Sequence, residues 1–280
     1  MSRVTLVPLL AVLGGLAGVT AISAQSRIER VSAADPPTAA EDRPIRTAAS
    51  EATAAVPAAA AENEARVGAE RSRRALARRR RPVHGIVRVR RPLALRSRPR
   101  GPIVSSLGAA TEFGSPSVAA VGTRRGAWLG LVTIARPNNK LGWVRRHDPG
   151  VGLRRISYSL QVDLSQRRLV LRRKGRAVKR LSVAVGRPGS STPTGRFAVT
   201  DKLDGSAYGS YYGCCILALS GTQPNLPAGW SGGNRLAIHG TNAPSTIGQP
   251  ASAGCLRAAD ADLAVLMRRV PLGTPLFVRP

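Results

Sequence analysis

Short segments of alternating apolar and polar residues follow one another from residue 83 to the C-terminus, and they limit this part of the chain to a β-rich fold. Residues 86–90 read Ile-Val-Arg-Val-Arg, and residues 158–164 read Tyr-Ser-Leu-Gln-Val-Asp-Leu. A period of two indicates half-buried strands, because successive side chains point to opposite faces of a sheet. We predict further strands at residues 128–134, 141–144, 169–171, 181–186, 196–200, 216–219, 236–239 and 275–278.

One segment near the C-terminus has a helical period instead. In residues 260–270 the apolar side chains fall on one face, and two acidic residues stand in the first turn, where the helix dipole favours negative charge. These residues are Leu263, Leu266, Met267 and Val270 on the apolar face, and Asp260 and Asp262 in the first turn. Residues 155–280 are therefore predicted to form a mainly antiparallel β domain with one clear helix.

Residues 83–150 are predicted to form a separate small β domain. A turn at residues 137–140 is followed by Gly142-Trp143-Val144, and this ending resembles a bacterial SH3-like domain, a small β-barrel often found in cell-wall enzymes. The alternative is that these strands extend the sheet of the domain that follows.

The N-terminal 24 residues predict export. Residues 1–3 make a short basic start, and residues 4–24 are an uncharged run rich in Leu, Val, Ala and Gly. Such a run is typical of a secretory signal peptide or an N-terminal membrane anchor. Small residues at 21–23 suit cleavage, whereas the length would also span a bilayer, so both readings stay open. We expect an extracytoplasmic location, in the cell wall or at the outer face of the plasma membrane.

Residues 25–82 are predicted to be a disordered linker. They are rich in Ala, Pro, Glu, Thr and Arg, with almost no aromatic residues, so they lack the apolar surface that a core needs. Residues 62–81 are the one part of it for which we expect a transient helix. The linker would let the rest of the chain reach from a membrane into the wall.

The charge of the chain predicts an anionic partner. It has 43 Lys and Arg against 15 Asp and Glu, a net charge of +28, and residues 66–100 alone contain 14 arginines and one glutamate. Those 35 residues, counting from 66 to 100, include no aromatic side chain on which bases could stack. Together with the export signal this favours anionic cell-wall polymers and argues against nucleic acid.

Neither a metal nor a nucleotide cofactor is expected. The three histidines, His84, His147 and His239, lie far apart, and there is no Cys-x-x-Cys pair of the kind that binds zinc. No glycine-rich phosphate loop ending in Gly-Lys-Ser/Thr is present.

Two of the three cysteines are adjacent. A disulfide between neighbours closes a strained ring, so Cys214 and Cys215 are expected to be small buried apolar residues rather than a bonded pair. The odd number leaves at least one thiol unpaired or bonded to another molecule.

Cys255 has the setting of a nucleophile. Small residues precede it, Arg257 follows two positions later, and a helix is predicted to begin shortly after. These features favour the thiolate form. Sixteen residues upstream, His239 ends a predicted strand. A cysteine beside a histidine is the minimal pair for acyl transfer, and the alternative is a buried cysteine with an unrelated turn histidine. Backbone N–H groups near Gly254 and Cys255 are candidate oxyanion donors.

Two motifs in this region resemble the L,D-transpeptidases with a YkuD-type catalytic domain. Residues 238–242 read Ile-His-Gly-Thr-Asn, and residues 252–257 read Ser-Ala-Gly-Cys-Leu-Arg. The family pattern is His-Gly-Thr, a spacer of about a dozen residues, and Ser-His-Gly-Cys-x-Arg/Asn. Upstream, residues 192–197 resemble the family's loop ending in Thr-Pro-x-Gly-x-Phe. The resemblance covers about residues 155–280.

The resemblance implies a β-sandwich-like catalytic domain and a cysteine mechanism. The family's cysteine attacks the bond between the third and fourth residues of a peptidoglycan stem tetrapeptide, and an amine on another stem resolves the thioester into a 3→3 cross-link. Carbapenems are implied to acylate the same sulfur. Cys255 matches the nucleophile and His239 the base. Gly240, Ser252 and Gly254 match supporting or oxyanion positions, and Thr241 and Arg257 match substrate-binding positions.

One residue departs from the family pattern. Ala253 stands where the family has histidine before Gly-Cys, which puts a secondary role in substrate binding or thiolate tuning in doubt. Two other functions stay open: an L,D-carboxypeptidase that uses water at the same site, and a non-catalytic protein that binds the cell wall.

Overall fold

A computed structural model describes residues 62–72 and 83–280. Residues 62–72 form an exposed helix, which lies within the segment 62–81 where the sequence predicts a transient helix. Its Ala, Glu and Arg residues are strong helix formers, which explains the helix without any packed face. The predicted signal or anchor at 1–24 lies outside the described residues. In the described part of the chain, no helix is long and apolar enough to cross a membrane.

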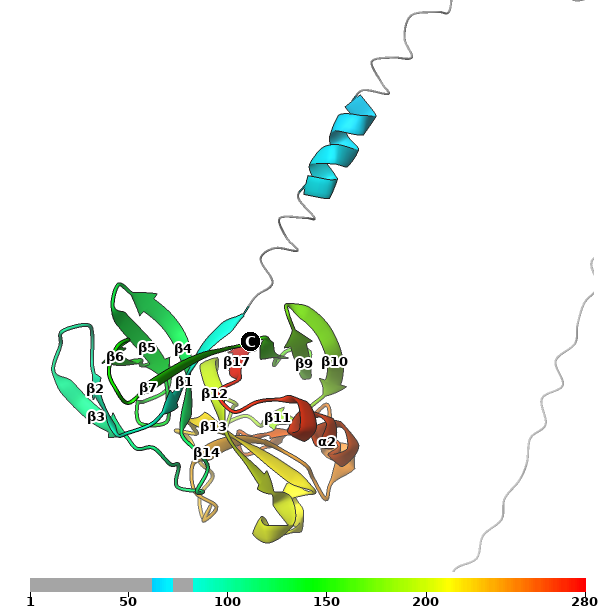
Figure 1. Cartoon of the computed structure of the whole chain (residues 1–280). Coiled ribbons are helices and arrows are strands. Elements are labelled where there is room, and N and C mark those ends of the chain that lie inside the picture. Colours follow the sequence, from blue (N-terminus) through cyan, green and yellow to red (C-terminus); the bar gives the residue numbers. More distant parts are fainter. Residues whose placement is uncertain (1–61, 73–82) are drawn as a thin grey trace, which may run out of the picture. The chain divides into compact units, whose positions relative to one another are not determined.

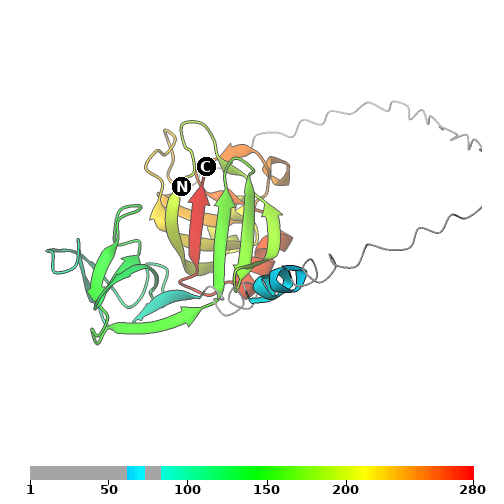
Figure 2. The same cartoon turned by 90° about the horizontal axis from the view of Figure 1, so that it is seen from above.

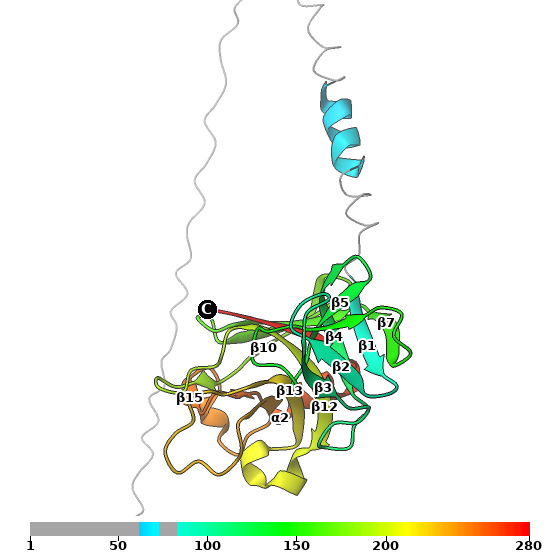
Figure 3. The same ribbon diagram turned by 90° about the vertical axis from the view of Figure 1, so that its left-hand side faces the viewer.

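The first sheet contains seven antiparallel strands in the order β3-β2-β6-β5-β4-β1-β7. Figure 3 shows β1, β4 and β5 of this sheet together with the hairpin of β2 and β3. Its strands are β1 (His84–Val89), β2 (Leu93–Arg96), β3 (Ile103–Leu107), β4 (Val118–Arg125), β5 (Trp128–Val132), β6 (Gly142–Arg145) and β7 (Val151–Ile156). Alternate side chains of β1, Val87 and Val89, are buried in its core. Since this sheet is separate from the next one, the alternative of an N-terminal extension is wrong.

The first sheet ends later than the sequence predicts. β7 pairs with β1 along its whole length, so the boundary lies near residue 156 rather than 150. The sequence of β7, Val-Gly-Leu-Arg-Arg-Ile, lacks a clear alternation, because only Gly152 of this strand is buried.

The second sheet contains eight strands in the order β10-β9-β8-β17-β12-β13-β14-β16, and Figure 2 shows β17 beside its neighbours. The strands are β8 (Tyr158–Asp163), β9 (Arg168–Arg173), β10 (Arg176–Ser182), β12 (Gly195–Asp204), β13 (Cys215–Thr222), β14 (Arg235–His239), β16 (Leu256–Arg257) and β17 (Pro275–Arg279). Most neighbours are antiparallel, but β17 runs parallel to β8 and β14 runs parallel to β16. The parallel pair β14–β16 brings two distant motifs together.

Short elements complete the second region. Helix α2 (Asp260–Arg269) contacts β13 and β14 and buries Leu263 and Leu266 against the core (Figure 1). A second parallel pair joins β11 (Val185–Gly186) to β15 (Pro250–Ser252). Three 3₁₀ turns, η1 (Gly205–Tyr208), η2 (Ser210–Tyr212) and η3 (Pro244–Thr246), lie in the loops.

Adjacent asparagines join the two sheets. The Asn138 side chain accepts a hydrogen bond from Thr222 N–H at 3.0 Å and donates one to the Thr222 carbonyl at 2.6 Å. Asn139 bonds in the same way to the Thr194 carbonyl and Arg196 N–H. Both side chains pair with backbone groups as a neighbouring strand would, so the turn between β5 and β6 holds the start of β12 and the end of β13.

Candidate active site

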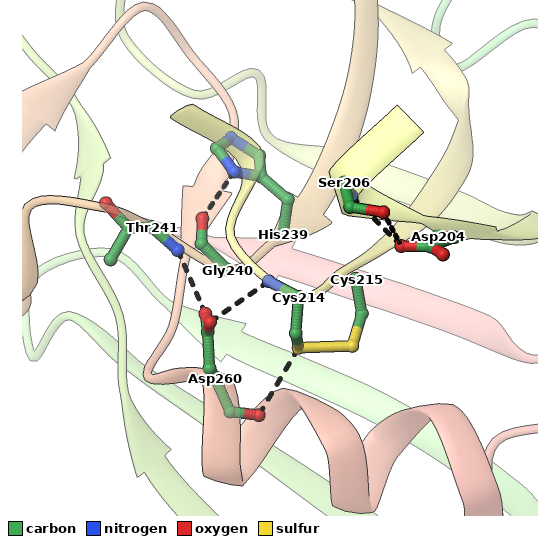
Figure 4. Close-up of a disulfide and its surroundings, with 8 residues drawn as sticks. All are labelled: Asp204, Ser206, Cys214, Cys215, His239, Gly240, Thr241 and Asp260. Atoms are coloured by element: carbon green, nitrogen blue, oxygen red, sulfur yellow. Dashed lines mark hydrogen bonds between the residues drawn. A yellow bond between two sulfur atoms is a disulfide. The ribbon is translucent and has the colours of Figure 1, made fainter. Parts of the chain in front are cut away.

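His239 is the last residue of β14 and is fully buried. Its Nδ1–H donates a hydrogen bond to the Gly240 carbonyl oxygen at 2.6 Å (Figure 4), which leaves Nε2 as the accepting nitrogen. Nε2 is buried and has no hydrogen-bond partner. Burial lowers the pKa of the imidazole from 6.5 to about 4, so the ring is neutral at pH 7 and can accept a proton.

Cys255 lies immediately before a neighbouring strand. It directly precedes β16, which runs parallel to β14 with Arg257 opposite His239. The structure therefore brings the two predicted catalytic residues to neighbouring strands, with Cys255 two positions before the residue that pairs with His239. The Cys255 thiol faces the Arg235 carbonyl oxygen at 3.7 Å. Among the described contacts there is no direct hydrogen bond between Cys255 and His239.

Burial of Cys255 works against the thiolate form that the sequence favours. Burial raises the pKa of the Cys255 thiol from 9.0 to about 11, and this outweighs the lowering effects of Ala237 N–H and the Arg257 charge. The sequence shows the nearby arginine but not how the folded chain surrounds the half-buried Cys255. Cys255 and His239 are thus a neutral pair, in which proton transfer must accompany the attack of the sulfur on a substrate.

The turn before Cys255 is held by its own polar groups. Ser252 Oγ donates to the Cys255 carbonyl at 2.6 Å and accepts from Gly254 N–H at 3.1 Å. Gly254 has a φ of +121°, a conformation that L side chains rarely adopt. Because Gly254 N–H is already bonded, it is not a free oxyanion donor in this conformation.

Arg257 is a buried cation beside the pair. Only 8% of its surface is exposed, and in the described part of the chain no acidic side chain forms an ion pair with it. Its Nη2 donates to the Tyr211 hydroxyl at 2.5 Å, and the guanidinium lies 4.6 Å from the centre of the Tyr211 ring. Nε has no partner. A buried, unpaired guanidinium favours an anionic ligand.

Asp260 holds the loop that follows His239, through a hydrogen bond to Thr241. Asp260 accepts hydrogen bonds from Thr241 N–H at 3.2 Å and Cys214 N–H at 3.0 Å (Figure 4), and Thr241 Oγ1 accepts from Ala243 N–H. A Cβ on Gly240 would lie 2.1 Å from the Asp260 carboxylate, so glycine is needed for this approach. The sequence identifies Asp260 only as a helix-opening acid, and its first-turn position was the available signal.

Cys214 and Cys215 form a disulfide, contrary to the prediction that they are unbonded (Figure 4). The sequence does not reveal what holds this backbone: Gly205 N–H bonds to the Cys214 carbonyl and Gly240 N–H bonds to the Cys215 carbonyl. The disulfide is therefore next to the loop that orients His239.

This pairing predicts how many thiols can be labelled. Unfolding the purified protein without reductant in excess iodoacetamide should add one carbamidomethyl group, on Cys255, because the other two sulfurs are bonded. Reduction before labelling should raise the number to three. Intact mass and peptide mapping measure both values, and three labels without reductant would show that Cys214 and Cys215 are free thiols.

Aromatic side chains line a pocket beside the sulfur. Tyr211, Tyr212 and Trp230 border it together with Cys255 and Ala253. The Tyr212 ring centre lies 4.9 Å from that of His239. The sequence does not single out these aromatic residues, because they lie in loops far from both motifs and follow no periodic pattern. Ala253 contributes only a small side chain here.

Comparisons with known proteins agree with the geometry. The profile of the YkuD family, described as the L,D-transpeptidase catalytic domain, matches residues 157–278. YkuD of Bacillus licheniformis, provisionally named an L,D-transpeptidase, is 34% identical over 127 residues, which cover 45% of this chain and 67% of the relative. The Bacillus subtilis protein of the same name is 32% identical over 125 residues, covering 44% and 66%.

A solved structure is a more distant match. The crystal structure of L,D-transpeptidase 3 from Mycobacterium tuberculosis is 18% identical, covers 50% of this chain and 74% of its own, and has a TM-score of 0.35. A likeness this distant supports no conclusion about activity. The sequence relatives and the family profile suffice for the assignment: the chain belongs to the YkuD family of L,D-transpeptidase catalytic domains.

Proposed function

We propose that the protein is an exported L,D-transpeptidase that forms 3→3 peptidoglycan cross-links through a thioester on Cys255. The observation that supports the proposal is the parallel pairing of β14 with β16, in which His239 pairs with Arg257 and Cys255 lies two positions before Arg257, all within the family segment. No metal or cofactor is needed for this chemistry, since the sulfur is the nucleophile and the imidazole carries the proton.

The first half-reaction uses the neutral pair. Cys255 Sγ attacks the carbonyl carbon of the third stem residue while His239 Nε2 takes the thiol proton. The Gly240 carbonyl holds Nδ1–H and stabilises the resulting imidazolium. We assign the oxyanion to the Cys255 N–H, because Ser252 Oγ occupies that of Gly254. The carbon–nitrogen bond then breaks, and the proton on Nε2 goes to the departing D-alanine amine.

The second half-reaction returns the enzyme to its resting state. The side-chain amine of a second stem attacks the thioester and gives its proton to His239, and the thiolate that leaves takes that proton back. Arg257 is proposed to bind a carboxylate of the stem peptide, since its buried guanidinium lacks an acidic partner. Peptidoglycan stem peptides are thus the proposed substrate on both sides of the reaction.

Product analysis tests this function and separates it from a carboxypeptidase. The full-length protein is incubated with tetrapeptide muropeptides, and the products are read by mass. A transpeptidase gives dimers that lack one D-alanine, whereas a carboxypeptidase, in which water resolves the thioester, gives tripeptides. Recovery of unchanged tetrapeptide alone would contradict both activities and favour a non-catalytic wall-binding protein.

We also propose that the protein binds anionic cell-wall polymers, on the hairpin of β9 and β10. No acidic residue occurs between Asp163 and Asp201 in the sequence. Arg173 and Arg176 stand directly opposite each other, an arrangement that destabilises a sheet. Arg167 and Lys174 adopt positive φ values of 47° and 52°, where glycine would be less costly. A bound polyanion would offset the repulsion between Arg173 and Arg176.

Charge reversal on the hairpin tests this surface. The variant Arg173→Glu/Arg176→Glu should weaken binding of the full-length protein to inorganic polyphosphate by about tenfold more than Arg154→Glu/Arg155→Glu, a loss of roughly 1.4 kcal/mol. The control pair is exposed on β7 and changes the net charge equally. Calorimetry at physiological salt measures both affinities. Equal losses would show that binding follows net charge and has no preferred surface.

Localisation follows from the N-terminal segment. We propose export to the cell wall or the outer face of the plasma membrane, directed by residues 1–24 as a signal or an anchor. Peptidoglycan and its anionic polymers lie on that side of the membrane, so the location agrees with the proposed substrates.

A further inference from the structure

Gln223 connects two loops at the catalytic turn. It follows β13 directly, and only 3% of its surface is exposed. Its Nε2 lies 3.1 Å from the Ser190 carbonyl oxygen, 3.0 Å from that of Ser191 and 3.2 Å from that of Ala253. Its Oε1 accepts from Asn225 N–H at 3.0 Å. One buried amide thus binds both the loop that follows β11 and the turn that carries Cys255.

The remaining polar groups of this turn bind the same loop. Thr192 Oγ1 donates to the Gly254 carbonyl at 2.8 Å and accepts from Gly186 N–H at 2.9 Å. The Ser252 carbonyl accepts from Arg187 N–H. Gly254 leaves room for the amide, because a Cβ there would lie 2.1 Å from Gln223 Nε2. The direction in which the Cys255 sulfur points therefore depends on contacts that Gln223 makes to the residue two positions before it.

The backbone of Gln223 is also held by hydrogen bonds. Its N–H donates to the Asn234 carbonyl at 2.7 Å, and Arg235, the next residue, supplies the carbonyl that faces the Cys255 thiol. On the other side, the Asn138 side chain holds Thr222. Hydrogen bonds of the Gln223 backbone and of Thr222 therefore fix the position from which the side-chain amide extends to the turn.

We propose that Gln223 is a positioning residue for Cys255, an inference that rests on the proposed function. Its amide keeps the half-buried sulfur aimed for attack beside His239. Without it, the turn would move away from the loop at 190–192, and the sulfur would become more accessible to solvent while losing its alignment with an acyl donor. Two measured rates should then change in opposite directions.

Two substitutions in the full-length protein test the role. Gln223→Met keeps the length of the side chain and removes the amide, and we expect carbapenem acylation of Cys255 to slow by about 100-fold, the scale of a misplacement near 1 Å. Alkylation by iodoacetamide should instead accelerate, by about tenfold for each unit that the thiol pKa falls toward its ordinary value. Both rates are measured well below the melting temperature of the variant.

Gln223→Glu adds a test that can be reversed within one sample. An ionised carboxylate would face three carbonyl oxygens, whereas its protonated form can donate one hydrogen bond. Burial raises the pKa of such a carboxyl, so the ratio of variant to wild-type acylation should increase as the pH falls from 8 to 5. Gln249→Glu is the matched control, because its exposed amide bonds only to the Ser245 carbonyl, and its ratio should stay constant.

The outcomes distinguish this inference from the proposed function. If carbapenem does not acylate the wild type, the proposed function fails, but the rise in alkylation still reports the positioning of the thiol. Wild-type rates of both reactions in Gln223→Met would overturn the inference. So would a matching change in Gln249→Glu. Loss of the native melting transition in both Gln223 variants would assign the residue to the stability of the fold instead.

Discussion

Cys255→Ala is expected to abolish thioester formation and cross-linking, with a loss on the order of 10⁶-fold, as for the removal of other covalent nucleophiles. No second thiol can replace it, because the structure pairs Cys214 with Cys215. Carbapenem should add a single adduct to the wild type and none to Cys255→Ser. Intact mass spectrometry detects the adduct, and muropeptide analysis measures the cross-links.

Alanine variants of the paired cysteines serve as the control. Cys214→Ala and Cys215→Ala should keep the adduct and mainly lower the melting temperature, since they remove a bond beside the loop of Gly240 rather than the nucleophile. Wild-type cross-linking by Cys255→Ala would refute the mechanism. An adduct that persists on Cys255→Ser would place the acylated group elsewhere in the chain.

The strands that could be predicted from the sequence are those with either an alternating pattern, as in β8, or a continuous apolar run, as in β13. The segments at 158–164 and 216–219 fall in β8 and β13, and the helix expected at 260–270 is observed at Asp260–Arg269. In contrast, β15 and β16 are too short to show a period. Yet β16 positions Cys255, so the sequence does not predict the pairing of β14 with β16 on which the site depends.

The chemistry of the site was harder to predict than its members. Cys255 and His239 were identified from residue type and motif, which depend on local sequence. Their protonation states depend on burial and on charges that the fold brings near, such as those of Asp260 and Arg257 near His239. The same applies to Gln223, whose three carbonyl partners come from two loops that approach it only in the folded protein.

His239→Ala should lower the acylation rate by about two to four orders of magnitude, the usual contribution of a general base. Iodoacetamide alkylation of Cys255 should hardly change, because the resting imidazole has not taken the thiol proton. The exposed His147→Ala is the control and should leave both rates unchanged. Stopped-flow acylation and alkylation followed by mass spectrometry measure the two rates.

The rates of acylation and alkylation should change with pH in the directions that the two pKa shifts set. With the His239 pKa lowered to about 4, the base is active above that value, so wild-type acylation should fall as the pH drops through about 4. With the Cys255 pKa raised to about 11, the thiolate is scarce below it, so alkylation should rise with pH throughout the neutral range. An alkylation plateau from pH 6 to 9 that disappears in His239→Ala would instead reveal a preformed thiolate–imidazolium pair. In that case the charge of Arg257 and the water in the substrate-free site, rather than burial, would determine the charge of the sulfur.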